Sequence, residues 1–270
     1  DLHRRRHSFP TRRSSDLDTQ ILYAHDPLYL IKIIEGKLSP SEQREIGFPW
    51  SEKMVERSRR SAGATVAACK AAMSEGVAVN LAGGTHHAYR DMGSGFCVFN
   101  DSAIAARALQ KEVSPKLKIA IIDLDVHQGN GTASILQQDS SIFTLSIHGE
   151  NNFPFKKEES DLDLGLADEC EDHEYLQALE NCLDQLDTRF RPDSLIFLAG
   201  ADPHEGDRLG RLKISGEGMR LRDETVLQYA LNRNLPIALS MAGGYGKEIE
   251  STVQIHFQTI KTALKFQNKY

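Results

Sequence analysis

The chain has 270 residues, 40% of them hydrophobic and 26% charged, which is ordinary for one large or two small globular domains. Its apolar stretches are all shorter than the roughly 20 residues of a membrane span. The net charge of −6 gives no general attraction to nucleic acid. The four cysteines form no CxxC pair, so the sequence indicates a reducing, cytoplasmic compartment and suggests neither a disulfide framework nor a cysteine zinc site.

The first 17 residues, DLHRRRHSFPTRRSSDL, differ from the rest because they hold five arginines and two acids with almost no apolar periodicity. A basic tail that binds nucleic acid and a transit peptide are two interpretations of this composition. We favour a third, in which residues 1–17 are a non-native or disordered leader. Residues 18–270 are then expected to form a single catalytic domain.

From residue 22 onward, helical periodicity and short apolar runs alternate along the chain. In chain order they predict helix 22–37, helix 51–76, strand 77–84, helix 101–111, strand 116–126, helix 132–139, strand 142–148, helix 173–190, strand 193–202, helix 218–234, strand 236–245 and a C-terminal helix. Strands that alternate with helices favour a mostly parallel sheet covered on both faces.

Polar residues follow each predicted strand, at the edge of a parallel sheet where ligands bind. In chain order they are Thr85-His86-His87, Asp125 with His127, His148, Asp202 and Tyr245. A single such residue is usually a helix cap or a turn former. Five strand ends that converge on one rim instead predict an active site.

The stretch IIDLDVHQGNGT, residues 121–132, supplies the centre of this site. The spacing by two places Asp123, Asp125 and His127 on one face of a strand. Buried carboxylates are costly unless something compensates their charge. Asp125 and His127 can reach one cation, and Asp202 is the best third ligand. This set of oxygen and nitrogen ligands suits zinc, ferrous iron or cobalt.

The remaining polar residues can complete a metal-assisted hydrolysis. A bound metal lowers the pKa of its water and polarises a carbonyl, and His86 or His87 could take the water proton. Tyr245 could donate a hydrogen bond to the developing oxyanion. Gly243 and Gly244 would let the backbone approach the substrate closely.

Six motifs in this order resemble the zinc-dependent histone deacetylase superfamily, which includes bacterial acetoin-utilisation and acetylpolyamine amidohydrolase proteins. They are GGTHHA, GSGFCVFND, IDLDVHQGNGT, LSIHGENNFP, AGADPHEGDRLGRL and AGGYG. IGFPWS, HQGNG and EGDRLGRL are most similar to the class IV-like branch and its bacterial relatives. The resemblance implies a three-layer α/β/α fold with a mostly parallel central sheet, as in arginases and deacetylases.

The resemblance also assigns roles to individual residues. It implies that the zinc ligands are Asp125, His127 and Asp202. His87 would be the general base and then the acid, and His86 would tune the site. Behind them, Asp123 would pair with His86 and Asn130 with His87. Because an amide holds a cationic imidazole less strongly than a carboxylate, Asn130 should give His87 a lower pKa than Asp would.

Further positions match the substrate tunnel and a second ion. Tyr245 matches the tyrosine that hydrogen-bonds the scissile carbonyl. The implied tunnel consists of Gly95, Phe96 and Phe153, with Leu209 at its rim, where polyamine-specific relatives carry a glutamate. The implied ligands of a structural potassium ion are Asp123, Asp125, His127, Ser146 and the backbone of Ile147.

The sequence departs from the family pattern in three places. Gln128 replaces a histidine that is common in class I, and Ala242 stands where a third glycine often precedes the tyrosine. Family members usually begin with an additional strand, and in this interpretation the leader takes its place. We therefore expect the fold to lack its native N-terminal strand, with an incomplete sheet edge.

The resulting hypothesis is a zinc-dependent amidohydrolase that removes an acyl group from N-ε-acyl-lysine of proteins. Hydrolysis of small acetylated amines such as acetylpolyamines is one alternative, and a catalytically impaired acyl-lysine binding protein is another. A binuclear manganese site of the arginase type is a third. That site needs a further carboxylate two residues beyond His127, where this chain has Gly129. Neither direct nucleic-acid binding nor membrane association is expected.

Overall fold

A computed structural model describes residues 14–269 and is built around one sheet of parallel strands. The strands lie in the order β1-β6-β5-β2-β3-β4, and every neighbouring pair is parallel. Their bounds are β1 (Val77–Asn80), β2 (Ile119–Asp123), β3 (Ile142–Gly149), β4 (Leu162–Leu166), β5 (Ser194–Leu198) and β6 (Ile237–Ser240). The predicted parallel sheet is confirmed, with β1 and β4 at its two edges.

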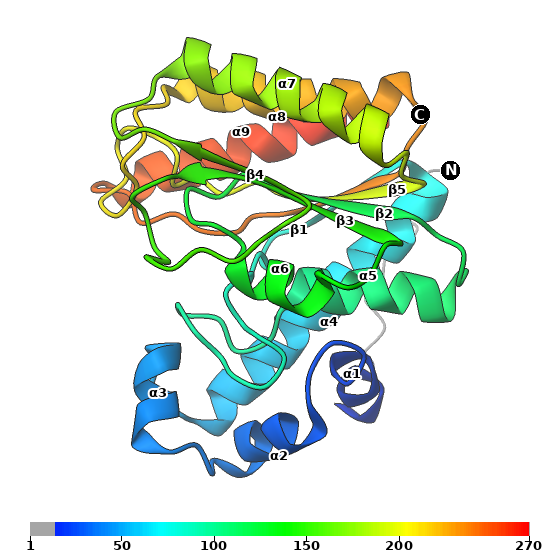
Figure 1. The fold of residues 1–270 in the computed structure, drawn as a ribbon, viewed down its shortest axis with the longest axis vertical. Coiled ribbons are helices and arrows are strands. Elements are labelled where there is room, and N and C mark those ends of the chain that lie inside the picture. The colour runs from blue at the N-terminus through cyan, green and yellow to red at the C-terminus, as the bar shows by residue number, and fades with distance from the viewer. Residues whose placement is uncertain (1–13, 270) are drawn as a thin grey trace, which may run out of the picture.

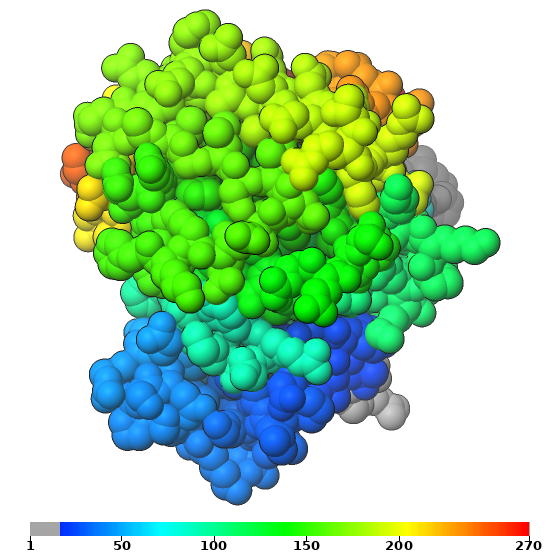
Figure 2. Space-filling view, in the orientation of Figure 1, coloured from blue at the N-terminus to red at the C-terminus, as the bar shows by residue number. Residues whose placement is uncertain are grey.

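Helices cover both faces of the sheet, as predicted (Figure 1). One layer consists of α7 (Asp172–Arg189), α8 (Gly216–Asn232) and α9 (Ile249–Gln267). The opposite layer consists of α4 (Glu52–Glu75), α5 (Asp101–Glu112) and α6 (Asn130–Leu136). Beyond α4 lie α1 (Ser14–Ile21), α2 (Pro27–Glu35) and α3 (Pro40–Ile46), the last two of which form the blue lower part of the surface in Figure 2. None of the described helices is both long and apolar enough to cross a membrane.

Strand β2 shows how the two faces of the sheet build two cores. Ala120 and Ile122 belong to the core that includes α7, α8 and α9, whereas Ile119 and Ile121 belong to the core that includes α4 and α5. All four residues are at most 1% exposed. Successive side chains of a strand point to opposite faces. A central strand of a doubly covered sheet therefore reads as a continuous apolar run.

Strands β2 and β4 differ from the prediction in different ways. Strand β2 ends at Asp123, so Asp125 and His127 lie in a bend beyond it and not on the strand itself. The alternation nevertheless continues, because Leu124 and Val126 still pack in the same core as Ile122. Strand β4 was not predicted, since it is a half-exposed edge strand in which Asp163 and Gly165, residue types that are rare in strands, alternate with leucines.

The N-terminal expectations concern residues that are only partly described. Residues 1–13 lie outside the described part of the chain, and the end of the expected leader belongs to α1. There Leu17 packs so closely on α4 that a Cβ at Gly63 would lie 2.3 Å from its Cδ2. Asp18 pairs with Arg59 at 2.6 Å. At the sheet edge, β1 pairs with β6 alone among the described strands. A non-native leader and a missing native strand both stay predictions.

Candidate active site

The loops that follow β1, β2, β5 and β6 surround a cavity of about 490 Å³ at the carboxyl ends of these strands. The predicted site residues that line it are His86, His87, Gly95, Phe96, Asp125, His127, Phe153, Asp202, Leu209, Gly243 and Tyr245. The structure therefore brings together residues from positions 86 to 245 of the chain. Of the predicted strand-end residues, His148 is the one that the cavity lining does not include.

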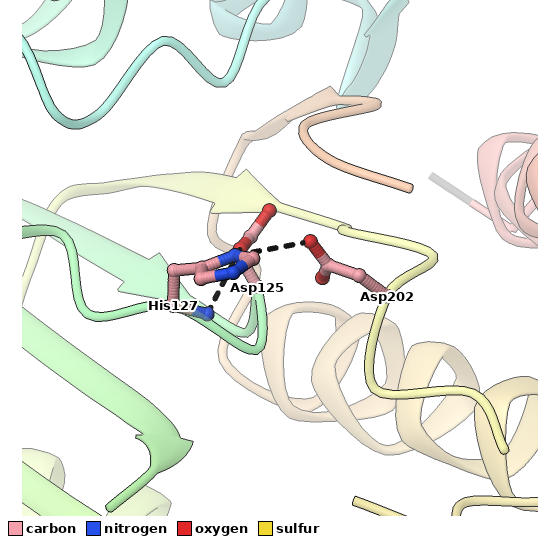
Figure 3. A group of neighbouring side chains, drawn as sticks. All are labelled: Asp125, His127 and Asp202. Carbon is pink, nitrogen blue, oxygen red and sulfur yellow. Dashed lines mark hydrogen bonds and ion pairs between the residues drawn. The ribbon is translucent and has the colours of Figure 1, made fainter. Parts of the chain in front are cut away.

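Asp125, His127 and Asp202 form a group whose ligand atoms all lie within 4.8 Å of one another. His127 Nδ1 is 2.9 Å from Asp125 Oδ1 and 3.3 Å from Asp202 Oδ2 (Figure 3). Each carboxylate is 1% exposed. Two buried carboxylates this close together require a compensating positive charge.

The protonation of this group shows how strongly the two carboxylates favour a cation between them. Burial alone would lower the pKa of His127, but the hydrogen bond to Asp125 and the negative charges of Asp125 and Asp202 outweigh it and raise the pKa to about 10. Burial and the charge of Asp125 raise the pKa of Asp202 to about 6. His86 and His127 outweigh burial at Asp125 and hold the pKa of its carboxyl well below its usual range.

Two further observations fit a metal ion at this position. Asp202 Oδ2 is buried and accepts no hydrogen bond from the described groups. A Cβ at Gly243 would lie 2.4 Å from Asp202 Oδ2 and 2.6 Å from Asp125 Oδ2, so a glycine leaves these oxygens uncovered. Two carboxylates and one imidazole are a ligand set for a catalytic zinc or ferrous ion with open positions.

A second metal with a bridging ligand at residue 129 does not fit this geometry. A Cβ at Gly129 would lie 2.4 Å from Asp123 Oδ2, the oxygen that contacts His86. There is thus no room at this position for the extra carboxylate of an arginase-type site.

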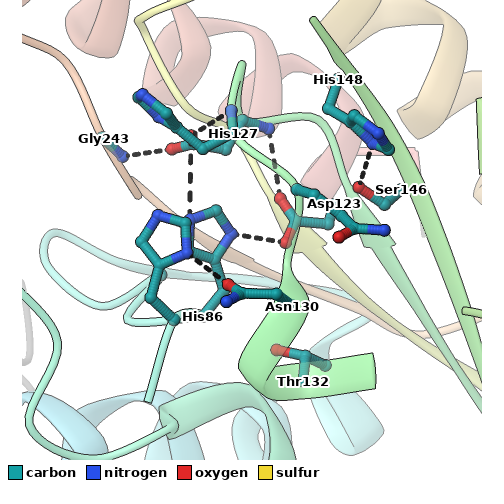
Figure 4. Close-up of polar contacts among 12 residues, drawn as sticks. His86, Asp123, His127, Asn130, Thr132, Ser146, His148 and Gly243 are labelled. Atoms are coloured by element: carbon teal, nitrogen blue, oxygen red, sulfur yellow. Dashed lines mark hydrogen bonds and ion pairs between the residues drawn. The ribbon is translucent and has the colours of Figure 1, made fainter. Parts of the chain in front are cut away.

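The rings of the adjacent histidines His86 and His87 are tilted by 48° with their centroids 4.1 Å apart, and they have different partners. His86 Nδ1 lies 2.6 Å from Asp123 Oδ2, as Figure 4 shows. His87 Nδ1 lies 2.6 Å from Asn130 Oδ1. Both predicted pairings are therefore present, one with a carboxylate and one with an amide.

These partners give the two rings opposite acid–base properties. Burial alone would lower the pKa of His86, but the charges of Asp123 and Asp125 outweigh it and raise the pKa to about 9. Burial and the positive charge of His86 lower the pKa of His87 well below its usual value. One imidazole of the pair is thus suited to carry a positive charge, and the other to remain neutral.

Aromatic rings line the cavity between the buried polar residues and the surface. Phe153 contacts the ring of His87 edge to face at a centroid distance of 4.9 Å. The ring centroid of Phe96 is 6.0 Å from that of Tyr245. Gly95 makes the contact between Phe153 and His87 possible, because a Cβ at Gly95 would lie 2.6 Å from His87 Cδ2 and 3.1 Å from Phe153. Leu209 is 48% exposed, as expected for a residue at the rim.

The turn that carries Tyr245 approaches the acidic group through its backbone. Gly243 N–H donates to Asp125 Oδ2 at 2.8 Å. Ala242 adopts a positive φ of 52°, a conformation that favours glycine. Gly84 makes room for its methyl group, because a Cβ at Gly84 would lie 2.4 Å from that of Ala242. Gly84 on the facing loop thus accommodates the methyl group of Ala242, the residue that stands where the family often has glycine.

The remaining residues of the expected potassium site lie behind the cavity, on β3. Ser146 is the register partner of Asp123 on the neighbouring strand, and Ile147 follows it. His148 is buried and its Nδ1 lies 3.0 Å from Ser146 Oγ (Figure 4). His148 therefore contacts the expected potassium ligands, and sequence position alone was misleading in grouping it with the residues of the cavity.

Residues that support the site were missed by the sequence analysis, although several lie inside the quoted motifs. Asn100 donates to the carbonyl oxygens of His86 and Ala88 at 3.2 and 3.1 Å. Asp101 accepts hydrogen bonds from Gly84 N–H and Thr85 N–H at 2.9 and 2.7 Å. Both hold the loop that carries the two histidines. Their position in the FND motif was the available signal, but their partners are distant in sequence.

Buried Arg222 on α8 is another supporting residue that the sequence analysis did not single out. It is 0% exposed and pairs with Asp223 at 2.7 Å. Its Nη1 donates to Gly200 O at 2.5 Å, on the loop that leads to Asp202. A charged residue within a helical pattern gives no sign in sequence that it is buried.

Comparisons with known proteins agree with this geometry. A family model described as the histone deacetylase domain matches residues 3–260. An uncharacterized protein of Picosynechococcus sp. is 45% identical over 232 residues, which cover 86% of this chain and 77% of that protein. Histone deacetylase 2 of Arabidopsis thaliana is 34% identical over 201 residues, or 73% of this chain. The match spans 51% of that plant protein, so the chain corresponds to about half of its length.

Among solved structures, a histone deacetylase homologue from Aquifex aeolicus superposes with a TM-score of 0.78 at 25% sequence identity. The superposition covers 93% of this chain and 70% of the other. The sequence match extends over nearly the whole chain, and the fold is shared with this homologue. The chain therefore belongs to the histone deacetylase family.

Proposed function

We propose that this protein is a zinc-dependent amidohydrolase that removes the acyl group from N-ε-acyl-lysine of proteins. The observation that carries the proposal is the meeting of three features in one cavity. They are the Asp125–His127–Asp202 group, the His86–His87 pair, and Tyr245 beside an aromatic wall. Hydrolysis adds water to the acyl carbon and breaks its bond to nitrogen, which yields a carboxylic acid and the free amine, and the acid then loses its proton to solvent.

His87 is the proposed general base and general acid. Its low pKa keeps the imidazole neutral near pH 7, so it can take a proton from water. The hydrogen bond from Nδ1 to Asn130 leaves Nε2 as the basic atom. The protonated ring then gives this proton to the leaving amine, which departs as a neutral group.

The negative charge that develops on the acyl oxygen needs stabilisation from donors in the cavity. Tyr245 supplies a hydroxyl at the cavity wall, and because burial raises its pKa, the hydroxyl keeps its hydrogen and can donate. His86 adds a positive charge close to the reacting atoms, since Asp123 keeps it protonated. The aromatic rings of Phe96 and Phe153 in the cavity lining would reduce the water around these groups and strengthen their electrostatic effect.

Asp125, His127 and Asp202 would hold the catalytic metal ion. Zinc bound there would polarise the acyl carbonyl and lower the pKa of the attacking water, and ferrous iron suits the same ligands. A structural potassium ion is proposed at Asp123, Asp125, His127, Ser146 and the backbone of Ile147. Its support is that Asp123 and Ser146 are buried neighbours on adjacent strands.

The acyl-lysine substrate is favoured by the shape and chemistry of the cavity. Phe96 and Phe153 offer apolar surface to a methylene chain. Leu209 at the rim is apolar, whereas a cationic polyamine would be better recognised by a carboxylate there. Small acetylated amines remain the alternative substrate class, and a binding protein without turnover is the non-enzymatic alternative.

A substrate screen with metal-loaded protein tests the proposal. Zinc-loaded and iron-loaded protein would be assayed on acyl-lysine peptides of increasing acyl length and on acetylpolyamines. We expect turnover of acyl-lysine peptides that Asp125→Ala and His87→Ala nearly abolish. His173→Ala, an exposed histidine on α7, is the matched control. Binding of acyl-lysine without turnover would favour the non-enzymatic alternative, and faster turnover of acetylpolyamines would favour small amines.

A further inference from the structure

A chain of hydrogen bonds runs from His87 away from the cavity. Asn130 accepts from His87 Nδ1 at 2.6 Å through Oδ1, and its Nδ2 donates to the hydroxyl of Tyr89 at 2.8 Å. The Tyr89 hydroxyl donates in turn to Glu158 Oε1 at 3.3 Å. Asn130 is buried, whereas Tyr89 and Glu158 are half-buried. None of the roles assigned above involves Tyr89 or Glu158.

Glu158, the last residue of this hydrogen-bond series, sets which group donates and which accepts in each bond. An ionised carboxylate can only accept hydrogen bonds, so the Tyr89 hydroxyl gives its proton to Glu158. The phenolic oxygen then accepts, and it must face the amide nitrogen of Asn130. The amide oxygen consequently faces His87 Nδ1, which must carry a hydrogen. A neutral imidazole has one such hydrogen, so Nε2 keeps its lone pair toward the cavity.

Glu158 is itself fixed by a residue of the same motif as Asn130. Gln128 accepts from the backbone N–H of Glu158 at 2.9 Å and donates to its carbonyl oxygen at 2.7 Å. Gln128 is 1% exposed, and it also donates to Asp163 Oδ1 at 2.9 Å. Gln128, which replaces the histidine that is common in class I, thus anchors the segment that carries Glu158.

We propose that Tyr89, held by Glu158, is a positioning residue that orients the Asn130 amide and thereby selects the Nδ1–H tautomer of His87. The proposal rests on the proposed function of His87 as general base. An aspartate at position 130 would accept from His87 with either oxygen. An asparagine has one accepting end and one donating end, so its orientation matters. A flipped amide would direct N–H toward His87 Nδ1 and favour the Nε2–H tautomer, which cannot take a proton from water.

Tyr89→Phe tests this role because it removes only the hydroxyl. Loss of one hydrogen bond weakens the preference for one amide orientation by about threefold to tenfold, so the flipped amide gains population and kcat should fall by up to that factor with KM unchanged. The matched control is Tyr229→Phe, which removes a hydroxyl that donates to Asp187 at 2.7 Å on the far helices. An unchanged kcat in Tyr89→Phe would overturn the proposal.

A double variant separates orientation from packing. In an Asn130→Asp background the acceptor is symmetric, so adding Tyr89→Phe should change kcat less than twofold. The same loss of kcat from Tyr89→Phe in both backgrounds would mean that Tyr89 acts through packing, and the proposal would be wrong.

Nitrogen-15 NMR of histidine-labelled protein at pH 7.5 reads the tautomer directly and requires no turnover. We expect a hydrogen on Nδ1 of His87 in the wild type and a mixture of tautomers in Tyr89→Phe. A wild type with the hydrogen on Nε2 would overturn the proposal. If the expected spectra appear but no acyl-lysine substrate is hydrolysed, the proposed function fails while the positioning role of Tyr89 holds.

Discussion

Asp207 accepts the backbone N–H of Tyr245 at 2.5 Å through Oδ2, and thereby ties the proposed oxyanion donor to the cavity rim. Through Oδ1 the same carboxylate accepts from the backbone N–H groups of Leu209 and Gly210 at 2.7 and 2.9 Å. Asp207 is 6% exposed. One buried side chain therefore fixes two loops that are more than 30 residues apart in sequence.

Asp207→Asn should release one of these loops but not both. The amide has one accepting end, so it can satisfy either Tyr245 N–H or the pair at Leu209 and Gly210. A lost hydrogen bond to a charged group is worth about 1.5–3 kcal/mol, so the released amides should exchange with solvent at least tenfold faster. Amide hydrogen exchange measures this. Asp168→Asn, at an exposed ion pair with Arg211, is the control, and unchanged protection in both loops would contradict the role of Asp207.

Tyr245→Phe should lower kcat on an acyl-lysine peptide by about 10²–10³-fold, because loss of one oxyanion donor has effects of this size. KM should change little if the hydroxyl acts mainly in the transition state. Tyr245 is 40% exposed, so the change should leave the fold intact. Steady-state kinetics measures both constants. A variant with full kcat would show that Tyr245 is not the oxyanion donor.

Asn130→Asp should move the acidic limb of the pH–rate profile for kcat/KM to higher pH. A carboxylate in place of the neutral amide favours the protonated ring, so the pKa of His87 rises from its lowered value. The base must be neutral to act, and activity is therefore lost at a higher pH than in the wild type. Asn232→Asp, at an exposed position at the end of α8, is the matched control. Superimposable profiles for wild type and Asn130→Asp would contradict the pairing.

Removal of the metal should make stability more sensitive to alkaline pH. In metal-free protein the pKa of His127 is raised to about 10 from an unfolded value near 6.5. A raised pKa contributes stability that is fully present below pH 6.5 and is lost as pH rises toward 10. A metal bound to the neutral ring replaces this proton and stabilises the folded state instead.

The difference in melting temperature between zinc-loaded and metal-free protein should therefore widen from pH 6.5 to pH 10. Thermal melts of chelator-treated protein, with and without added zinc, measure it. A difference that stays constant across this range would argue against His127 as a ligand. A metal-free protein that gains stability with rising pH would contradict the raised pKa of His127.

The sequence by itself determined the sheet and most of the cavity residues. Apolar runs with flanking helical periodicity identified five of the six described strands, and the missed one, β4, is an edge strand in which Asp163 and Gly165 break the apolar run. The alternation around Asp123, Asp125 and His127 placed them correctly on one side, even though the strand ends at Asp123. The alternation of side chains along an extended backbone follows from backbone geometry alone, so the spacing of residues in the sequence is enough to predict it.

Only the tertiary structure decided which side chains support those residues. Asp207 accepts a hydrogen bond from the N–H of Tyr245, 38 positions away in the sequence. Tyr89 accepts one from the side chain of Asn130, 41 positions away. In each case the partner lies on a loop whose path depends on how the layers pack, and sequence spacing carries no information about that path. Hydrogen bonds need partners within about 3 Å and correct donor–acceptor polarity, so their pattern emerges only when the fold brings distant loops together.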